Sequence, residues 1–479
     1  MLIGLIFWAL PLAAAEPSGP DWRAPNESRT VVEEPRWMPP KESLPSDPPR
    51  TSVSAQSPVV AEPQPEIIPA PSPLLPVPQP DATPIGPENG PVLMDDPGGA
   101  PAMMGECEDP DDPWFPYFGP LLLGRFPWLY DRLWLRAEYL DMWTQGARLP
   151  PLVTTGEGLV QDAGKLGLDS TQVLLGNETV LAGARSGGRF TLGAWLTPCH
   201  CESIEVTYLF LGTETSNLAF TSALTPVLAR PYFDAAAGAQ SAFPVAYTNL
   251  VTGDVTIEST SDFQAAELLL RRVMVRRPRE RLDLVVGYRY ARLEDFLGIH
   301  QFSHWTHAQP GIQAGTTKNI DDLFDTTNQF HGGEFGVVYE RRNGRWSLEM
   351  LMKMGLGVSR AATQIEGQTV TQAPLVGEST VAAGLLAQAS NMGQHVENDF
   401  AVMPELGLTL GCNVTRRLRW TFGYTFLYWS KVTRPGDQID LALSQIPPAA
   451  AAASARPTFL PRTTDFWAQG INTGLDFRF

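Results

Sequence analysis

The chain has 479 residues with a formal net charge of −17, and it contains 44 prolines, 42 glycines and only 18% charged residues. Few charges and many helix breakers argue against a helical or strongly charged soluble protein. The acidic balance excludes the basic patch that nucleic-acid binding requires, so no nucleic-acid partner is expected. Four cysteines in a chain of this length exclude a disulfide scaffold.

The first residues are predicted to be an export signal. Residues 2–15 form an apolar run that ends in Ala13-Ala14-Ala15, which suits a signal peptidase site before Glu16. The run is too short to cross a bilayer as a helix, and no other stretch reaches 18 apolar residues without a break. We therefore expect a signal peptide at 1–15 in an exported protein that is not a helical membrane protein.

Residues 16–110 are predicted to be a disordered, proline-rich linker. They hold 24 of the 44 prolines, and 16 acidic residues stand against 5 basic ones. Such a composition cannot bury a core and favours extended, partly polyproline conformations. We interpret the segment as a periplasmic spacer. A second hypothesis is that it reaches a periplasmic or cell-wall partner. Residues 111–479 are long enough for one large β domain or two ordinary ones, and we predict that they form one outer-membrane barrel.

From Leu133 onward, the chain alternates apolar with small or polar residues at period two, which is typical of β-strands. In the first such segment, Leu135, Ala137 and Tyr139 share one face, and Arg136 and Glu138 share the other. The pattern predicts ten strands, at 133–143, 190–196, 204–210, 262–276, 282–290, 335–339, 346–354, 402–410, 418–428 and 471–479.

The connections between these segments alternate in length. Tight turns are predicted at Pro198–Glu202, Arg277–Glu280, Arg341–Gly344 and Asn413–Arg416. The first of these turns contains Cys199-His200-Cys201, which has no second cysteine pair to complete a zinc site. Long loops are predicted at 147–187, 213–260, 293–330, 359–398 and 433–464.

Short turns on one side, long loops on the other and an even strand count are typical of an outer-membrane barrel in a Gram-negative envelope. We therefore predict an all-β, transmembrane, antiparallel up-and-down β-barrel of about ten strands, with both ends in the periplasm. Loops 213–260 and 359–398 could each contain a further hairpin, which would give 12 or 14 strands.

The outward faces are apolar along their length, which predicts contact with outer-membrane lipid. The last segment ends in an aromatic residue at period two with its neighbours, at Leu475, Phe477 and Phe479. We interpret these three residues as an assembly signal for the barrel-assembly machinery.

The predicted inward face carries eight acidic and seven basic residues, with Glu267 and Glu334 among the acidic ones. Charges in this position must meet water or one another. A balanced set suits either a weakly selective channel or a lumen crowded with ion pairs. The leading candidates for residues that line the pore and set its selectivity are Arg136, Glu138, Arg289, Glu349, Lys353 and Glu405.

Two further groups of residues are candidates, one for a metal site and one for a catalytic site. Oxygen ligands suit Ca²⁺, but one oxygen-rich run lacks the glycine and terminal glutamate of an EF-hand loop, and we interpret it as a capped turn: Asp321, Asp322, Asp325 and Asn328. His331 with Asp325 or Asp437 matches no nucleophile or base arrangement. The Gly-Xaa-Ser-Xaa-Gly elbow is also absent. We expect no cofactor, no metal and no catalysis.

Several stretches of the chain resemble a known family, the outer-membrane β-barrel porins numbered seventh in their series and known mainly from planctomycete bacteria. The resemblance spans about 133–479 and includes Ala137-Glu138-Tyr139-Leu140, Gly188-Arg189-Phe190-Thr191-Leu192-Gly193, Gly287-Tyr288-Arg289-Tyr290, Thr327-Asn328-Gln329-Phe330-His331-Gly332-Gly333, Arg434-Pro435-Gly436-Asp437-Gln438-Ile439-Asp440 and Phe466-Trp467-Ala468-Gln469-Gly470. It implies an outer-membrane location and, by name only, a porin role, with no established substrate and no catalytic residues.

These observations predict a porin for passive diffusion of small hydrophilic solutes. The alternative is a non-conducting barrel that stabilises or tethers the envelope through its linker and exposed loops. Strand count separates the two hypotheses, because ten strands with paired lumen charges favour the tether and twelve or more with an open axis favour the pore.

Overall fold

The computed structural model describes residues 132–446 and 456–479. The predicted signal peptide at 1–15 and linker at 16–110 lie outside the described residues, as does Cys107. Among the described residues, no helix is long and apolar enough to cross a membrane.

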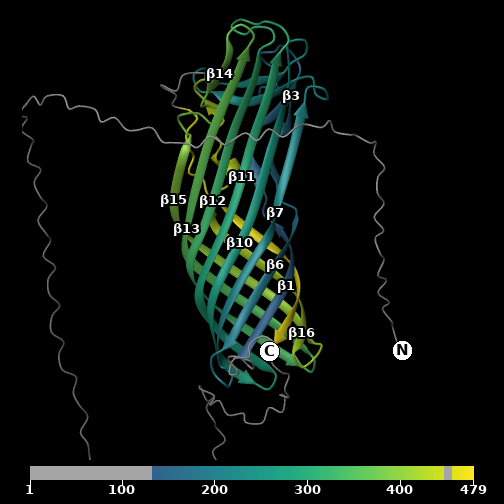
Figure 1. The fold of residues 1–479 in the computed structure, drawn as a ribbon, viewed down its shortest axis with the longest axis vertical. Coiled ribbons are helices and arrows are strands. Elements are labelled where there is room, and N and C mark those ends of the chain that lie inside the picture. Colours follow the sequence, from purple (N-terminus) through teal and green to yellow (C-terminus); the bar gives the residue numbers. More distant parts are fainter. Residues whose placement is uncertain (1–131, 447–455) are drawn as a thin grey trace, which may run out of the picture. The chain divides into compact units, whose positions relative to one another are not determined.

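Ten antiparallel strands close into a barrel (Figure 1). Each strand pairs with its neighbours in chain order, β12 pairs β13, and β18 returns to pair with β1. The barrel strands are β1 (Leu133–Thr144), β6 (Ala184–Trp195), β7 (Glu202–Thr221), β10 (Val251–Arg277), β11 (Glu280–Trp305), β12 (Thr317–Asn343), β13 (Trp346–Ala373), β15 (Gly393–Asn413), β16 (Leu418–Val432) and β18 (Thr464–Arg478).

The two ends of the barrel differ. Four short connections lie at one end, together with the start of β1 and the end of β18, and we call this the turn end. The five longer connections lie at the other end, which we call the loop end. The predicted ten-strand barrel is confirmed, and the additional hairpins considered for loops 213–260 and 359–398 do not enter the ring.

An apolar band surrounds the half of the barrel nearer the turn end. On β13 the outward positions from Trp346 to Val358 are all apolar, whereas Arg360 follows at the next outward position. Twelve residue steps of about 3.3 Å, tilted by about 40°, span about 30 Å, which matches the hydrocarbon core of a bilayer. This half of the barrel therefore provides the membrane-spanning surface.

Strands β10 to β13 continue far beyond this band, so three predicted loops are shorter than expected. The observed connections are 222–250, 306–316 and 374–392. The reason is that the apolar residues of these strands switch from the outward positions to the inward positions. In the band the outward positions are apolar, such as Leu268 and Leu270, whereas near the loop end the inward positions are apolar, such as Val255 and Ile257. A strand whose outer face becomes polar resembles a loop in sequence.

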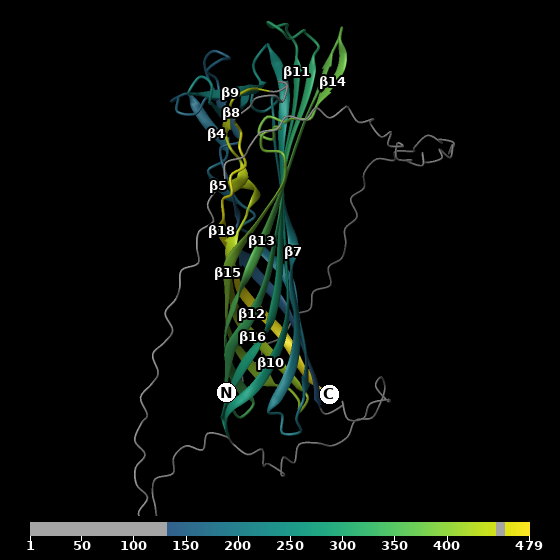
Figure 2. The same ribbon diagram turned by 90° about the vertical axis from the view of Figure 1, so that its left-hand side faces the viewer.

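A head of two layers stands at the loop end (Figure 2). The extended strands β10 to β13 form one layer. A five-stranded sheet forms the other, from β3 (Val153–Gly156), β4 (Thr171–Leu175), β8 (Leu228–Asp234), β9 (Ala239–Ala246) and β17 (Ala442–Leu443). An apolar core joins the layers and includes Leu152, Tyr232 and Val245 from the small sheet side and Ile299 and Phe324 from the barrel strands.

Three short elements complete the loop end. Strands β2 (Ala147–Leu149) and β5 (Glu178–Val180) pair with each other. Strand β14 (Gly377–Val381) folds back on the end of β13. The 3-10 helix η2 (Pro435–Gln438) lies in the connection from β16 to β18 and contacts β2, β11 and β12.

Candidate functional site: the barrel lumen

Seven charged side chains form a ring across the lumen at the level of the membrane-spanning half. The sign of the charge alternates from one contributing strand to the next. The members of this charge ring are Glu138 on β1, Arg189 on β6, Glu267 on β10, Arg289 on β11, Glu334 on β12, Lys353 on β13 and Glu405 on β15.

The register of the strands brings opposite charges directly across from one another. Glu138 faces Arg189, Glu267 faces Arg289, and Lys353 faces Glu405. Directly opposite residues in an antiparallel pair have neighbouring Cβ atoms, so oppositely charged partners attract. The alternating ring is therefore a consequence of inward positions at period two combined with the pairing of the strands.

Lys353 lies at the centre of the charge ring. Its Nζ is 2.6 Å from Glu267, 3.0 Å from Glu405 and 3.5 Å from Glu334. Arg289 forms ion pairs with the same three carboxylates, at 3.1 Å from Glu334. Arg189 joins Glu138 at 2.6 Å and Glu405 at 3.5 Å. The three acceptor carboxylates come close enough for a metal ion, but two protein cations already lie among them.

A second charged layer lies nearer the turn end. Arg136 forms ion pairs with Glu349 at 2.9 Å and with Asp476 at 3.5 Å. Arg271 forms an ion pair with Glu205 at 2.8 Å. Asp283 on β11, Glu340 on β12 and Arg419 on β16 extend this layer. Charged groups removed from bulk water are stable only when paired, and these side chains form ion pairs with one another across the lumen.

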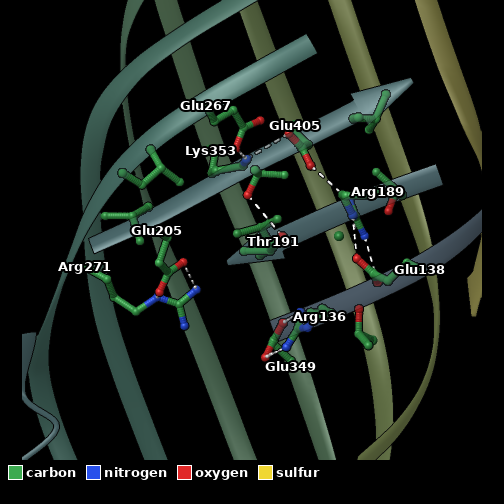
Figure 3. Close-up of a pocket in the computed structure, with 18 of the residues that line it drawn as sticks. Arg136, Glu138, Arg189, Thr191, Glu205, Glu267, Arg271, Glu349, Lys353 and Glu405 are labelled. Carbon is green, nitrogen blue, oxygen red and sulfur yellow. Dashed lines mark hydrogen bonds and ion pairs between the residues drawn. The ribbon is translucent and has the colours of Figure 1, made fainter. Parts of the chain in front are cut away.

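Between the two layers remains a cavity of about 70 Å³ (Figure 3). Figure 3 shows Arg136 pointing toward Glu349, Arg189 toward Glu138, and Lys353 toward Glu267 and Glu405. A water molecule needs on the order of 10–15 Å³ of such a cavity, so there is room for a few waters. The cavity is a polar pocket between ion pairs and is too small for a hydrated solute.

Above the charge ring, toward the loop end, the lumen is filled by apolar side chains. In this lumen plug, the ring of Phe330 meets Trp429 edge-on at 6.1 Å, and Phe263 lies 5.2 Å from Phe466. The other buried members are Leu140, Met142, Leu211, Ala265, Ala291, Leu293, Ala401, Met403, Leu427, Val432 and Ala468. Close packing of this kind fills the lumen between the charge ring and the loop end.

The connection after β16 enters the barrel above the lumen plug. The buried Arg434 places its Nε 2.8 Å from Asp295 on β11. Asn328 on β12 accepts a hydrogen bond from the amide of Thr433 at 2.7 Å and donates one to its carbonyl oxygen at 2.8 Å. A Cβ at Gly436 would lie 2.0 Å from the carbonyl oxygen of Arg148, so only glycine fits there. These contacts hold residues 433–438 as a cover over the lumen, which we call the cover segment.

All six residues predicted to line a pore face the lumen. Each of them forms an ion pair, and the most exposed side chain, that of Arg136, is only 16% exposed. They therefore line a packed interior. Sequence reasoning also placed Glu267 and Glu334 inward, but it missed the pair between Arg434 and Asp295, for which the spacing of the residues gives no signal.

The four oxygen-rich candidates do not form one site. Asp321 and Asp325 face outward on β12, whereas Asp322 and Asn328 face inward, because residues of a strand alternate between its faces. Asp322 accepts a hydrogen bond from Arg230 at 2.7 Å and two from backbone amides of the connection from β13 to β15. The expectation of a capped turn was wrong, because these residues belong to a long strand.

The catalytic candidates are also separated. The His331 Nδ1 lies 2.7 Å from the hydroxyl of Tyr288 on the outer face of the barrel. Asp325 lies further along the outer face of the same strand, and Asp437 belongs to η2 in the cover segment.

At the end of β18, Leu475 and Phe477 face outward, with exposed fractions of 49% and 37%. The ring of Phe479 packs edge-on against Phe477 at 5.0 Å, and its amide donates a hydrogen bond to the carbonyl oxygen of Leu133. The three residues predicted as an assembly signal therefore lie together at the seam where β18 meets β1.

The fold and the lumen define this chain as an integral β-barrel of the outer membrane. It belongs to the family described as putative beta barrel porin-7, which it matches over residues 134–479. No curated protein matches the chain.

Among solved structures, the chain is similar to the outer membrane protease OmpT from Escherichia coli, with 8% identity, 73% of this chain and 97% of that chain covered, and a TM-score of 0.35. It is also similar to a bacterial polysaccharide outer membrane secretin, with 6% identity, coverage of 73% and 99%, and a TM-score of 0.14. A third similar structure is the toluene transporter TodX of P. putida, with 8% identity, coverage of 74% and 92%, and a TM-score of 0.13.

Proposed function

We propose that this protein is a closed outer-membrane barrel that anchors a head at the cell surface and acts in tethering or stabilising the envelope. The filled lumen carries this proposal. Two layers of ion pairs, the lumen plug and the cover segment follow one another along the barrel axis. Ten strands leave an interior that side chains can fill, whereas water-filled porins use 16 to 18 strands. The proposal includes no catalytic step and no cofactor.

The proposed orientation places the turn end in the periplasm and the head outside the cell. Short periplasmic turns and longer external loops are the rule for outer-membrane barrels, and the described chain shows that asymmetry. Because β1 begins at the turn end, the linker at 16–110 would then lie in the periplasm after removal of residues 1–15. There it could bind a periplasmic or cell-wall partner, which would complete a tether between two layers of the envelope.

Two further partners belong to this proposal. The outward apolar band would contact outer-membrane lipid, and the end of β18 would be recognised by the barrel-assembly machinery. The location of Phe477 and Phe479 at the closing seam supports the second role. Nucleic acid is not among the proposed partners.

Passive diffusion of small hydrophilic solutes is the second candidate function. The description of the family and the polar cavity between the charged layers favour it. Conduction would require the cover segment to leave the barrel and the lumen plug to rearrange. Both are held by buried contacts, notably the pair between Arg434 and Asp295.

Single-channel recording in a planar bilayer separates the two functions. We expect the full chain to be silent while circular dichroism shows folded β structure. A variant with Arg434→Ala and Asn328→Ala releases the cover segment and should show more open-channel events than the native protein. Arg417→Ala, at an exposed turn, is the matched control and should remain silent. Stable conductance steps from the native protein would overturn the closed barrel and establish the pore.

A further inference from the structure

Strand β7 extends well beyond its neighbour β6. The last pair between the two strands joins Gly187 to Leu211, after which β6 turns away. On its other side, β7 stays paired with β10 as far as Thr221. Within the described ranges 132–446 and 456–479, no strand pairs with residues 213–221 on the side away from β10. This segment, the β7 edge, is about 30 Å of strand whose side away from β10 is open except at its start, where Gly183 and Arg185 bond to the carboxylate of Glu214.

Alternate backbone groups of the β7 edge point to the open side. The amide of Ser222 bonds to the carbonyl oxygen of Gly253, so the even-numbered residues of β7 direct their backbone groups toward β10. The odd-numbered residues direct theirs away from it. The amides and carbonyl groups of Thr215, Asn217 and Ala219 are thus available to a further strand.

The inner face of the β7 edge begins with Glu214 and Ser216 and is apolar and incompletely covered over its second half. Leu218 and Phe220 pack against the head core but are only half-buried, whereas their partners on β10, Ile257 and Val255, are buried. The apolar layer of the head therefore continues to the edge and stops there. A strand added to β7 would cover Leu218 and Phe220 with its own inward side chains and extend the head core.

The outer face beside the β7 edge is acidic. Asp254, Glu258 and Asp262 project from β10 on that face, and residues 251–270 contain no lysine or arginine. The β7 edge itself presents only small side chains there, at Thr213, Thr215, Asn217 and Ala219. A strand added to β7 would thus place its outward side chains one strand away from a row of carboxylates, which favours basic residues.

The β7 edge is protected only at its start, by the bulge in its pairing with β10 and by the inward-facing Glu214. Proteins commonly shield exposed edges with lysine, proline or short strand length, and this segment has neither residue type and nine residues of strand. We propose that the β7 edge binds an extended segment of a partner polypeptide by strand addition. The segment carries apolar side chains toward the head core and basic or polar side chains outward. This inference deepens the proposed function, on which it rests, by giving the tether its external partner.

Peptide binding to the full chain in detergent tests the proposal. The probe is a fluorescent peptide of sequence Val-Lys-Val-Thr-Val-Lys-Val, followed by anisotropy. It should bind the native protein, more weakly as salt is raised. Asn217→Pro removes one edge amide without touching the ladder to β10, and it should weaken binding by at least about fivefold. Asn217→Ala keeps the amide and should bind like the native protein.

The controls separate the parts of the proposal. A peptide with glutamate in place of lysine should bind at least about fivefold more weakly, because it faces the carboxylates of β10. No binding of the lysine peptide, equal binding by Asn217→Pro and Asn217→Ala, or equal binding of the two peptides would overturn the inference. Because no voltage or conduction enters the measurement, a barrel that proved to be a pore would leave its result unchanged.

Discussion

At the scale of single residues, the charge ring depends on Lys353. This side chain is 5% exposed and approaches three carboxylates that would otherwise repel one another. A buried ion pair contributes little compared with a well-packed apolar group, but the loss of one partner leaves an uncompensated charge. Lys353 therefore contributes little net stability, but its removal would leave buried negative charge uncompensated.

Lys353→Met should destabilise the barrel by about 3–5 kcal/mol in free energy of unfolding, because it strands buried carboxylates. Unfolding in urea, followed by tryptophan fluorescence, measures the change. Lys431→Met, at an exposed position, is the matched control and should shift the free energy by less than about 0.5 kcal/mol. Equal effects of the two substitutions would show that the ring does not require its central cation.

Asp440 acts at the loop end, outside the membrane-spanning half. Burial alone would raise the pKa of its carboxyl group, but hydrogen bonds from Arg456 at 2.8 Å and from the amides of Thr458 and Ala442 lower that pKa below its ordinary value. The carboxylate thereby clamps two parts of the same connection. The contribution of Asp440 to the stability of this connection is fully present above the ordinary pKa of about 3.9. It is lost as the pH falls through the lower pKa of the folded protein.

Hydrogen exchange near residues 456–459 should therefore stay constant from pH 7 to about 4, after correction for the intrinsic rate, and show more opening below that. Asp440→Asn lacks the charge and should show the more open state at every pH. A native protein that behaves like Asp440→Asn at neutral pH would contradict the clamp.

At the scale of elements, the ten barrel strands could be predicted because lipid contact imposes an apolar residue at every outward position, which is every second residue of a strand. The strand extensions could not, because the same strands change phase where they leave the membrane and begin to cover a head core. Val255 and Ile257 face inward there, whereas Leu268 and Leu270 face outward lower down. A prediction based on one continuous apolar face therefore ends each strand at this switch, although the backbone pairing of the strands continues beyond it.

The candidate site could likewise be predicted only in part from the sequence. Period two and register together place Glu138, Lys353 and Glu405 in the lumen, and the balance of charges favours ion pairs. The partners of Arg434 and Asn328 depend on how a long connection folds back into the barrel. That contact joins residues 105 positions apart in the chain for Asn328 and Thr433, and no local pattern encodes it.

The end of β18 carries an element-scale prediction. Phe477→Ser with removal of Phe479 should reduce the amount of folded barrel in the outer membrane several-fold, because the strand loses the aromatic residues at the closing seam. The measurement compares heat-modifiable mobility on gels of membrane fractions. Phe422→Ser, another outward aromatic residue but within β16, is the control and should assemble more completely. Equal assembly would remove the proposed recognition role.

At the scale of the whole molecule, the apolar band and the head define opposite ends of a protein that has one orientation in the membrane. The head core holds more than twenty buried apolar residues, so the loop end is a folded body and not a set of flexible connections. The proposed tether and the proposed strand addition at the β7 edge both require this body to face the cell exterior, with the linker on the periplasmic side.

Cysteine labelling on intact cells tests this orientation. In a variant whose four native cysteines are replaced by serine, Leu375→Cys lies at a connection of the loop end with an 84% exposed side chain, and Arg279→Cys lies in the exposed turn between β10 and β11. A maleimide that cannot cross the membrane should label position 375 in intact cells and position 279 only after lysis. Labelling of both after lysis controls for reactivity. The reverse pattern in intact cells would place the head in the periplasm, and the external tether would then be excluded, since its partner-binding edge would face the cell interior.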